Sequence, residues 1–293
     1  MDGILNINKP VGMSSFDVVK SVRAVSGTKK VGHAGTLDPG ASGVLPICIG
    51  HATKLVDYIM KDEKIYIARL KLGIETDTYD KYGKILSEKR VDASRDEVEN
   101  AVMSFVGNIQ QVPPMYSALK VNGRRLYELA RKGIEIERKS RNIVIHNMEI
   151  LELKLPYVTI KVKCSKGTYI RSLCHDIGCK LGCGGTMWDL VRTHTGKFDI
   201  LESVPISELD KDSIFKYLIP MEDVLSRYPS LHVGAQFEKH VLNGIIIHDK
   251  NFLNKVEENI LYKVYIGENN FIGIGMNKKD IGFKMIKLLI RGN

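Results

Sequence analysis

Apolar and polar residues alternate with a period of two along several short segments, a pattern that predicts strands with one buried face. The first such segment, residues 4–8, precedes Lys9-Pro10. Further strands are predicted at residues 65–72, 143–151 and 158–164. Because the last two are separated by only a short connection, they indicate an antiparallel hairpin.

Apolar residues at helical spacing predict the helices between these strands. The valines at 18, 19, 22 and 25 share one face of a helix that opens at Ser14 and stops at Gly27. The other predicted helices are residues 95–106, capped by Asp92 or Ser94; residues 125–132, between the turn signal Asn122-Gly123 and Gly133; and a segment starting near Thr168. Helices that interleave with hairpins predict an α+β fold with a mixed, mostly antiparallel sheet flanked by helices.

The pattern changes after Pro229. One helix is predicted there, at residues 237–243, and turn signals separate short apolar runs in the remainder. These runs are residues 245–247, 261–266, 271–274 and 286–290. A tail of about 65 residues can fold by itself, so we expect residues 1–228 to form one domain and residues 229–293 a small β-barrel.

The composition is that of a soluble globular protein with an excess of basic residues. The 293 residues include 43 Lys or Arg and 34 Asp or Glu, which gives a formal charge of +9. Such an excess favours a polyanionic partner, because cationic side chains release counterions when they neutralise phosphates. A membrane surface is the competing interpretation. It is disfavoured because the chain has neither an apolar stretch of about 18 residues nor a helix with opposed basic and apolar faces.

The N-terminus and the cysteines indicate a cytosolic protein with reduced thiols. Met1 to Asn6 contain no basic n-region and no long apolar core, as a signal peptide would require. Five cysteines are an odd number in a chain that needs no disulfide to fold. Cys174, Cys179 and Cys183, with His175 nearby, have no C-x2-C pair, so a packed helix is favoured over a metal site.

Several common catalytic motifs are absent from the sequence. It contains no phosphate-binding G-x-x-x-x-G-K-[ST] loop, no H-E-x-x-H and no G-x-S-x-G. Residues 77–83 superficially resemble a calcium loop, but Lys81 would lie among the ligands and the closing Glu is missing. We therefore expect a turn at residues 77–83 and no metal site.

The glycine-rich loop at residues 32–43 is the strongest candidate for chemistry. Its glycines allow tight turns, and Pro39 biases Asp38 towards an extended conformation that presents the carboxylate. A carboxylate can act as a nucleophile, as a base or as an electrostatic partner for developing positive charge. On composition alone, however, an Asp in such a loop is better explained by a simple Asx-turn.

Five ordered segments change that interpretation, because together they resemble the TruB family of tRNA pseudouridine-55 synthases. The resemblance spans roughly residues 3 to 198 and includes the loop around Asp38. The matching segments are residues 8–12 (NKPVG), 33–46 (HAGTLDPGASGVLP), 64–66 (KIY) leading to 73–80 (GIETDTYD), 111–123 (QVPPMYSALKVNG) and 164–171 (CSKGTYIR). The tail resembles, more weakly, the PUA-type RNA-binding module.

The resemblance implies an enzyme that isomerises uridine-55 in the T-loop of tRNA to pseudouridine. Asp38 would be the catalytic carboxylate, acting either by covalent addition or by assisting deprotonation of the sugar. No electron or group leaves the system, so no cofactor is expected. We also expect no required protein partner and a monomeric protein.

The same resemblance implies roles for six further residues. Arg171 would pair with Asp38, and Tyr66 would stack on the base and act in the last deprotonation. The remaining implied substrate-binding residues are His33, Asp80, Tyr169, Leu190 and Lys9. Outside the family context, Tyr66 and Leu190 would be interpreted as core residues, Arg171 as a surface ion pair and Lys9 as a solvated charge.

A basic stretch completes the expected RNA-binding surface. From Lys120 to Arg141 there are eight Lys or Arg and three Glu, which alone would suggest a solvated face. By resemblance it belongs to an insertion, at about residues 115–145, that grips the tRNA arm. Val191 stands where the family often has a basic residue. Two alternatives are a tRNA-folding chaperone that does not depend on catalysis and the guide-RNA-directed relative; the intact motifs and the basic insertion favour the stand-alone enzyme.

Overall fold

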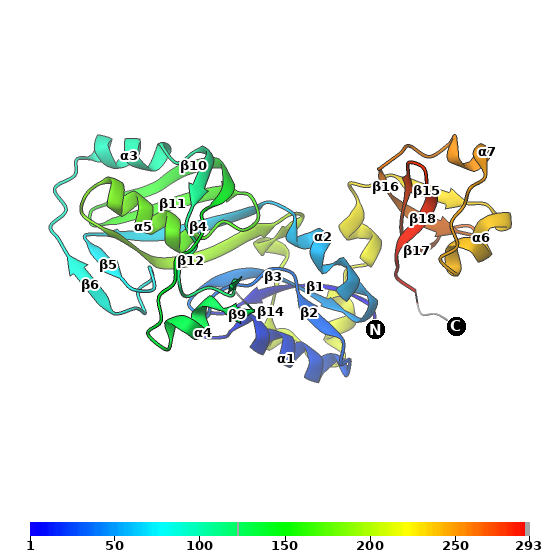
Figure 1. The fold of residues 1–293 in the computed structure, drawn as a ribbon. Coiled ribbons are helices and arrows are strands. Elements are labelled where there is room, and N and C mark those ends of the chain that lie inside the picture. The colour runs from blue at the N-terminus through cyan, green and yellow to red at the C-terminus, as the bar shows by residue number, and fades with distance from the viewer. Residues whose placement is uncertain (122, 291–293) are drawn as a thin grey trace.

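A computed structural model describes residues 1–121 and 123–290 and contains a large mixed sheet and a smaller C-terminal sheet (Figure 1). Across the large sheet, the strands follow the order β14 (Val204–Pro205), β1 (Gly3–Lys9), β3 (Ser42–Ile49), β12 (Gly185–Thr195), β4 (Lys64–Leu72), β11 (Tyr157–Cys164), β10 (Arg141–Lys154) and β7 (Gly107–Gln111). Two short strands complete it: β2 (Val31–His33) pairs with β3, and β13 (Phe198–Asp199) pairs with β12.

Most neighbouring strands in this sheet are antiparallel. The exceptions are the parallel pairs β1–β14 and β3–β12. The predicted hairpin is formed by β10 and β11. The α+β prediction with a mixed, mostly antiparallel sheet is therefore confirmed.

Seven α-helices lie in the described part of the chain. They are α1 (Ser15–Ser26), α2 (Val56–Met60), α3 (Arg95–Met103), α4 (Leu126–Ala130), α5 (Ile170–Lys180), α6 (Ala235–Leu242) and α7 (Lys250–Leu253). Short 3-10 helices occupy Gly50–Leu55, Ile200–Glu202, Ile206–Glu208, Ser213–Tyr217 and Met221–Leu225. Two small hairpins pair β5 (Ile74–Thr76) with β6 (Ile85–Glu88) and β8 (Lys120–Val121) with β9 (Arg124–Arg125).

Local sequence explains where α1 begins and ends. The Ser14 hydroxyl accepts the Asp17 N–H at 3.1 Å, and the Asp17 carboxylate accepts the Ser14 N–H at 3.1 Å. Such a cap stabilises a helix by about 1 kcal/mol. Gly27 ends the helix at φ 62°, a left-handed conformation that favours glycine. The predicted start and stop of this helix are confirmed.

Apolar residues cover both faces of the sheet around β1 and β3. Leu5 and Ile7 belong to the main core together with the buried valines of α1. Ile4 faces the other side and packs in a second core with Ile59 of α2 and Phe198. Because both faces are covered, β3 forms a continuous apolar run rather than an alternating one.

Several strands were not predicted, and one of them is central to the sheet. The pattern indicated neither β7 nor β12, although β12 lies between β3 and β4. Register shifts between Met187 and Asp189 and between Arg192 and His194 break the alternation of β12. The side chain of Arg192, moreover, is almost fully buried, at 1% exposure. A buried arginine within a bulged strand hides the period of two.

Three predicted helix boundaries need adjustment. The helix expected at 95–106 ends at Met103, and Ser94 rather than Asp92 caps it. The helix expected at 125–132 is shorter, at Leu126–Ala130. The strands β8 and β9 pair on either side of the predicted turn, of which Asn122 lies outside the described residues and Gly123 has φ 79°.

The C-terminal part is an open sheet with its own core, so the barrel prediction is wrong in detail. Its strands run in the order β15 (Ser230–Val233), β16 (Leu261–Ile266), β17 (Asn270–Lys278) and β18 (Gly282–Leu288). Within the described residues β15 and β18 do not pair with each other, so the sheet does not close. The run at 245–247 contributes only a bridge from Ile247 to Phe283, and the unpredicted helix α7 precedes β16.

Apolar contacts and polar bonds join the two parts. Leu55 and Leu225 form a buried cluster with Ile274 and Leu289 of the tail. The Lys54 Nζ donates to the Leu288 carbonyl of the tail. Nowhere in residues 1–121 or 123–290 does a helix combine the length and apolar character needed to cross a membrane.

Candidate active site

Asp38 lies in the connection between β2 and β3, and the backbone on either side of it is firmly held. The Ser15 hydroxyl donates to the Leu37 carbonyl at 2.9 Å and accepts the Leu37 N–H at 2.8 Å. The Gly12 N–H donates to the Pro39 carbonyl at 2.8 Å. Contacts from the start of α1 and from the preceding turn therefore fix the loop and present the Asp38 side chain, which is 38% exposed.

Lys9 supports this loop from within the protein. It is fully buried, and its Nζ donates to the carbonyls of Pro10 at 2.8 Å and Met13 at 2.7 Å. The same Nζ lies 3.5 Å from the Pro39 carbonyl. Burial lowers the pKa of Lys9 to about 8, and the negative charge of Asp38 opposes this fall. Lys9 is thus a buried support for the Asp38 loop and not the solvated charge of the alternative interpretation.

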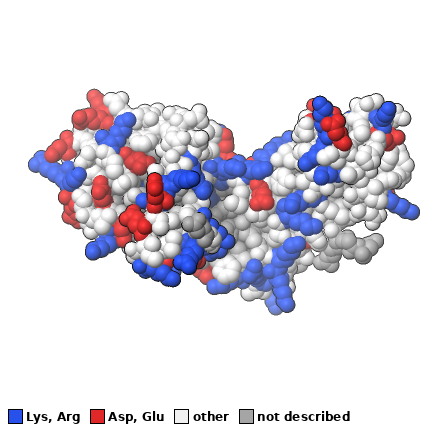
Figure 2. Space-filling model, viewed as in Figure 1, with Lys and Arg blue, Asp and Glu red and all other residues white. Residues whose placement is uncertain are grey.

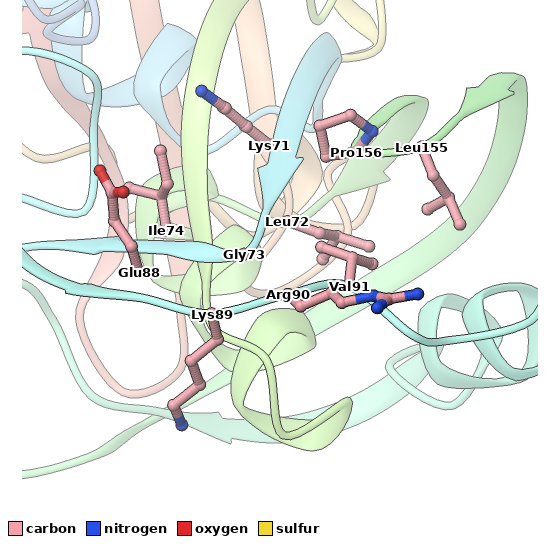
Figure 3. A pocket seen from close by; sticks show the side chains of 10 residues that line it. All are labelled: Lys71, Leu72, Gly73, Ile74, Glu88, Lys89, Arg90, Val91, Leu155 and Pro156. Carbon is pink, nitrogen blue, oxygen red and sulfur yellow. The ribbon is translucent and has the colours of Figure 1, made fainter.

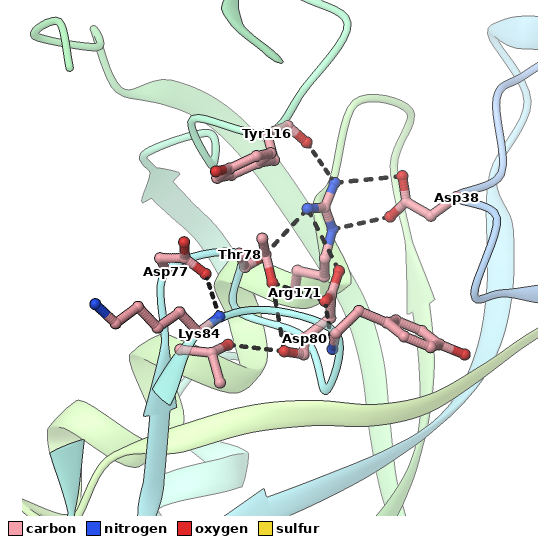
Figure 4. Close-up of polar contacts among 9 residues, drawn as sticks. Asp38, Asp77, Thr78, Asp80, Lys84, Tyr116 and Arg171 are labelled. Carbon is pink, nitrogen blue, oxygen red and sulfur yellow. Dashed lines mark hydrogen bonds and ion pairs between the residues drawn. The ribbon is translucent and has the colours of Figure 1, made fainter. Parts of the chain in front are cut away.

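Arg171, at the start of α5, holds the Asp38 carboxylate (Figure 4). Its Nε lies 2.8 Å from Oδ2 and its Nη2 lies 3.3 Å from Oδ1 of Asp38. The remaining N–H groups donate to the carbonyls of Tyr116 at 2.8 Å and Thr78 at 3.2 Å. Only 6% of the side chain is exposed, so this is a two-point ion pair at the edge of the interior and not a surface salt bridge.

The turn that follows β5 supplies the second carboxylate near Arg171. Asp80 Oδ2 lies 3.7 Å from Arg171 Nη1. Its Oδ1 accepts the Thr78 hydroxyl at 2.7 Å and the Tyr82 N–H at 3.0 Å. These bonds turn Asp80 inward, and residues 77–83 form a turn as predicted. The contact of Asp80 with a substrate base stays a prediction.

Tyr66 and Leu190 lie side by side on the buried face of β4 and β12. Leu190 is opposite Ala68, two residues from Tyr66 on the same face of β4. Both side chains are almost fully buried. Burial raises the pKa of Tyr66, and the positive charge of Arg192 opposes this rise.

Tyr169 reaches the site from the residue before α5. Its N–H donates to the Gln111 side chain at 2.8 Å, and the same amide donates to the Tyr169 carbonyl at 3.0 Å. Burial raises the pKa of Tyr169, and Asp38 adds to this rise. Gln111 is therefore a buried residue that aligns the entrance of α5, and with it Arg171.

His33 lies on β2 at the rim of a groove of about 610 Å³ between β2, α1 and α2. Its Nδ1 is buried without a hydrogen-bond partner. The side chains that line the groove include Phe16, Arg23, Lys29 and Lys30. Phe16 is 52% exposed, and the cationic groups of Lys20 and Arg23 lie 5.0 and 5.8 Å from the centre of its ring. The groove thus combines an exposed aromatic ring with positive charge.

Arg192 is a structural member of the site that the sequence did not indicate. Its Nε donates to the Val44 carbonyl at 2.8 Å and its Nη2 to the Gly35 carbonyl at 3.1 Å. It lies opposite Tyr66 in the sheet and holds the first half of the loop that carries Asp38. An isolated Arg within a strand that is otherwise largely buried is the signal that could have revealed it.

The segment just before the basic stretch lies against the site. Tyr116 contributes the carbonyl that Arg171 binds, and the Ser172 hydroxyl donates to the Val112 carbonyl at 2.9 Å. Arg138 donates to the Pro113 carbonyl at 3.1 Å and is mostly buried. These contacts anchor the preceding segment and Arg138, while Lys132, Lys139 and Arg141 remain exposed.

Two other features contain none of the predicted site residues. A groove of about 600 Å³ at the far ends of β4 and β6 is lined by Lys71, Lys89 and Arg90, among others, and by none of the predicted site residues (Figure 3). The thiol of Cys179 lies 3.4 Å from His175 Nε2. Among the described residues, no three His, Cys, Asp or Glu side chains are placed to share a metal ion.

Two family models match consecutive parts of the chain. Residues 23–170 match the model of the TruB family pseudouridylate synthase N-terminal domain. Residues 171–226 match the tRNA pseudouridylate synthase B C-terminal domain. The boundary between the two matches separates Asp38 from Arg171, although both belong to one site built on one sheet.

Individual relatives match over nearly the whole chain. The tRNA pseudouridine synthase B of Clostridium kluyveri is 58% identical and that of Clostridium novyi 53%, each over 99% of this chain and 100% of the relative. A crystal structure of a Cbf5-Nop10-Gar1 complex contains a chain with 25% identity and a TM-score of 0.74, covering 98% of this chain and 85% of that one. The chain therefore belongs to the TruB family of pseudouridylate synthases.

Proposed function

We propose that this protein converts uridine-55 in the T-loop of tRNA to pseudouridine, with Asp38 as the catalytic carboxylate. The observation that carries the proposal is the two-point pair between Asp38 and Arg171, at 2.8 and 3.3 Å. A buried guanidinium orients this partly exposed carboxylate, so one oxygen edge is occupied while the side chain stays accessible. The tRNA specificity of the named relatives supports the choice of substrate.

The chemistry needs little beyond a positioned carboxylate. The N1–C1′ bond of the uridine breaks, the uracil rotates, and C5 bonds to C1′ before its proton is lost. Substrate and product are isomers, so the reaction balances without an oxidant or a group donor. We assign Asp38 to act at the sugar in these steps. The hydrogen bonds that fix the neighbouring backbone hold its carboxylate in the alignment that catalysis by a positioned group requires.

The neighbouring side chains suit a pocket for the base. We assign stacking on the uracil to Tyr66, with Leu190 beside it on the same sheet face, and contacts at the pocket wall to Tyr169. We assign a polar contact with the base to Asp80. We also assign proton removal from C5 to Tyr66, which lies on the same buried sheet face as Leu190.

A target base inside a folded loop must first leave its stack, at a cost of a few kcal/mol. The basic surface offsets this cost. Figure 2 shows Lys and Arg side chains gathered in the middle of one face, while acidic side chains gather towards the end that carries β5, β6 and α3. His33 and the groove beside it lie next to the Asp38 loop, where the vacated position in the RNA would be filled.

We further propose that residues 1–228 form the catalytic domain, that residues 115–145 grip the T-arm and that residues 229–293 form a PUA-like RNA-binding domain. The tail has a separate core built around Val264 and Phe283, which supports its treatment as a unit. We propose a cytosolic monomer that needs no protein partner.

The test uses purified protein and an unmodified tRNA transcript, with pseudouridine mapped by carbodiimide treatment and primer extension. A single stop at position 55 is expected. A matched transcript with cytidine at position 55 should give no product. Modification at a different position would overturn the specificity, and no modification together with accelerated tRNA refolding would favour the chaperone alternative.

A further inference from the structure

One face of α5 holds the turn that contacts Arg171. Arg171, His175 and Cys179 follow each other at intervals of four residues, so they project from the same side of the helix. Arg171 binds Asp38 and the turn at residues 78–80. One helical turn further on, the His175 ring lies parallel to the Tyr79 ring, with centroids 4.0 Å apart and an angle of 9°.

Tyr79 occupies a conformation that its side chain disfavours. Its φ is 62°, and it is one of three residues other than glycine with positive φ in the described chain. A β-carbon is strained in this left-handed region, and such a residue persists only where its surroundings hold it in place. The strained residue separates Thr78 from Asp80, the two turn residues that contact Arg171.

The backbone of Tyr79 is held on the opposite side by the sheet. Its carbonyl accepts the Met187 N–H of β12 at 3.0 Å, and its N–H donates to Thr76 at 3.2 Å. The aromatic ring supplies the contact with α5. The turn is therefore clamped between β12, through its backbone, and α5, through the stack with His175.

We propose that His175 and Tyr79 are positioning residues for the reaction assigned to this site. Their stack holds the left-handed turn, so that the Thr78 carbonyl and the Asp80 carboxylate keep Arg171 in the geometry that aligns Asp38. We assign neither ring a contact with the substrate. The inference rests on the proposed catalytic role of Asp38 and adds a support that residue patterns alone do not indicate, because a left-handed tyrosine has no sequence signal.

Two substitutions at position 175 test the stack. His175→Ala should slow single-turnover conversion of saturating tRNA transcript about tenfold, because small displacements of catalytic groups are costly. The dissociation constant for tRNA should stay within twofold. His175→Phe keeps a flat ring and should recover most of the rate. Lys180→Ala, at an exposed position near the end of the same helix, is the matched control and should react like the unmodified protein.

Substitutions of Tyr79 separate the effect of its backbone strain from the effect of the ring stack. They test the proposal even if His175→Ala folds poorly. Tyr79→Gly adopts positive φ without strain and should be faster than Tyr79→Ala, which retains the strain without the ring. In the Tyr79→Gly background, His175→Ala should have no further effect. Wild-type rates for both His175→Ala and Tyr79→Ala would overturn the inference, as would a loss of tRNA affinity with an unchanged rate. If Asp38→Asn remained active, the proposed function itself would fail instead.

Discussion

Replacing Arg171 with lysine isolates the contribution of the two-point ion pair. Lysine keeps one positive charge but concentrates its donors on a single nitrogen, so it cannot serve the carboxylate edge and both carbonyls at once. Arg171 now binds Asp38 together with the carbonyls of Tyr116 and Thr78. The substitution therefore leaves at least one of these acceptors without its partner.

The size of the effect follows from burial. One buried acceptor left unpaired costs about 1–3 kcal/mol of unfolding free energy. Asp38 adds little to this, because its carboxylate is 38% exposed and water can replace the lost contact. The single-turnover rate should fall by a larger factor than stability, because a displacement of the catalytic carboxylate by about 1 Å lowers the rate on the order of 100-fold. Arg171→Ala should cost about 3–5 kcal/mol, because it leaves the Tyr116 and Thr78 carbonyls without a donor and removes the cation beside the mostly buried Asp80.

Urea unfolding and single-turnover conversion of tRNA transcript measure the two effects separately. Arg227→Lys is the matched control, because Arg227 also binds a carboxylate and a backbone carbonyl but lies outside the site. The control should lose little stability and keep its rate. If Arg171→Lys matched the control in rate while losing stability, Arg171 would be a structural residue and the alignment argument would be refuted.

Three further predictions concern the loop, its buried lysine and the RNA surface. Gly43→Ala should destabilise the protein by about 1–3 kcal/mol in urea unfolding, because φ is 104° and the new methyl would lie 2.2 Å from a backbone oxygen of β12. Unfolded Lys9 binds a proton up to pH about 10.5 but the folded residue only up to about 8, so folding releases a proton in this window. Relative to Lys9→Met, the wild type should therefore gain up to about 1.4 kcal/mol of stability per pH unit there; a flat difference would contradict this. Replacing Lys132, Lys139 and Arg141 with serine should make the slope of log affinity against log salt shallower by about 2–3, as measured by filter binding, and an unchanged slope would exclude these residues from the interface.

Hydrophobic periodicity predicted much of the architecture but not its centre. Regular alternation identified β1 and β4, and the valines of α1 with Ser14 and Gly27 identified a complete helix. The central strand β12 was not predicted, because two register shifts interrupt its alternation of apolar and polar residues and a buried arginine lies within it. In the tail, three of the four predicted apolar runs overlap strands, while the run at 245–247 forms only a bridge; such runs also do not reveal whether a sheet closes.

The candidate site required more than local pattern. Composition alone favoured a simple turn at Asp38, and Arg171 lies 133 residues away, beyond the reach of any periodicity argument. Only the ordered segments shared with a known family connected the two. Contacts made through backbone groups, such as those of Arg192 and Gln111, remained hidden because they depend on carbonyl positions in the folded chain.

The central claim is that Asp38 carries the chemistry, and one substitution tests it most directly. Asp38→Asn preserves the size of the side chain while removing its charge, and Asp96→Asn on the exposed face of α3 is the matched control. Pseudouridine is measured at position 55 of an unmodified tRNA transcript under single-turnover conditions with excess enzyme. We predict that Asp38→Asn binds the transcript with wild-type affinity but forms no detectable product, while the control reacts normally. Pseudouridine formation by Asp38→Asn at a rate near that of the wild type would contradict the account.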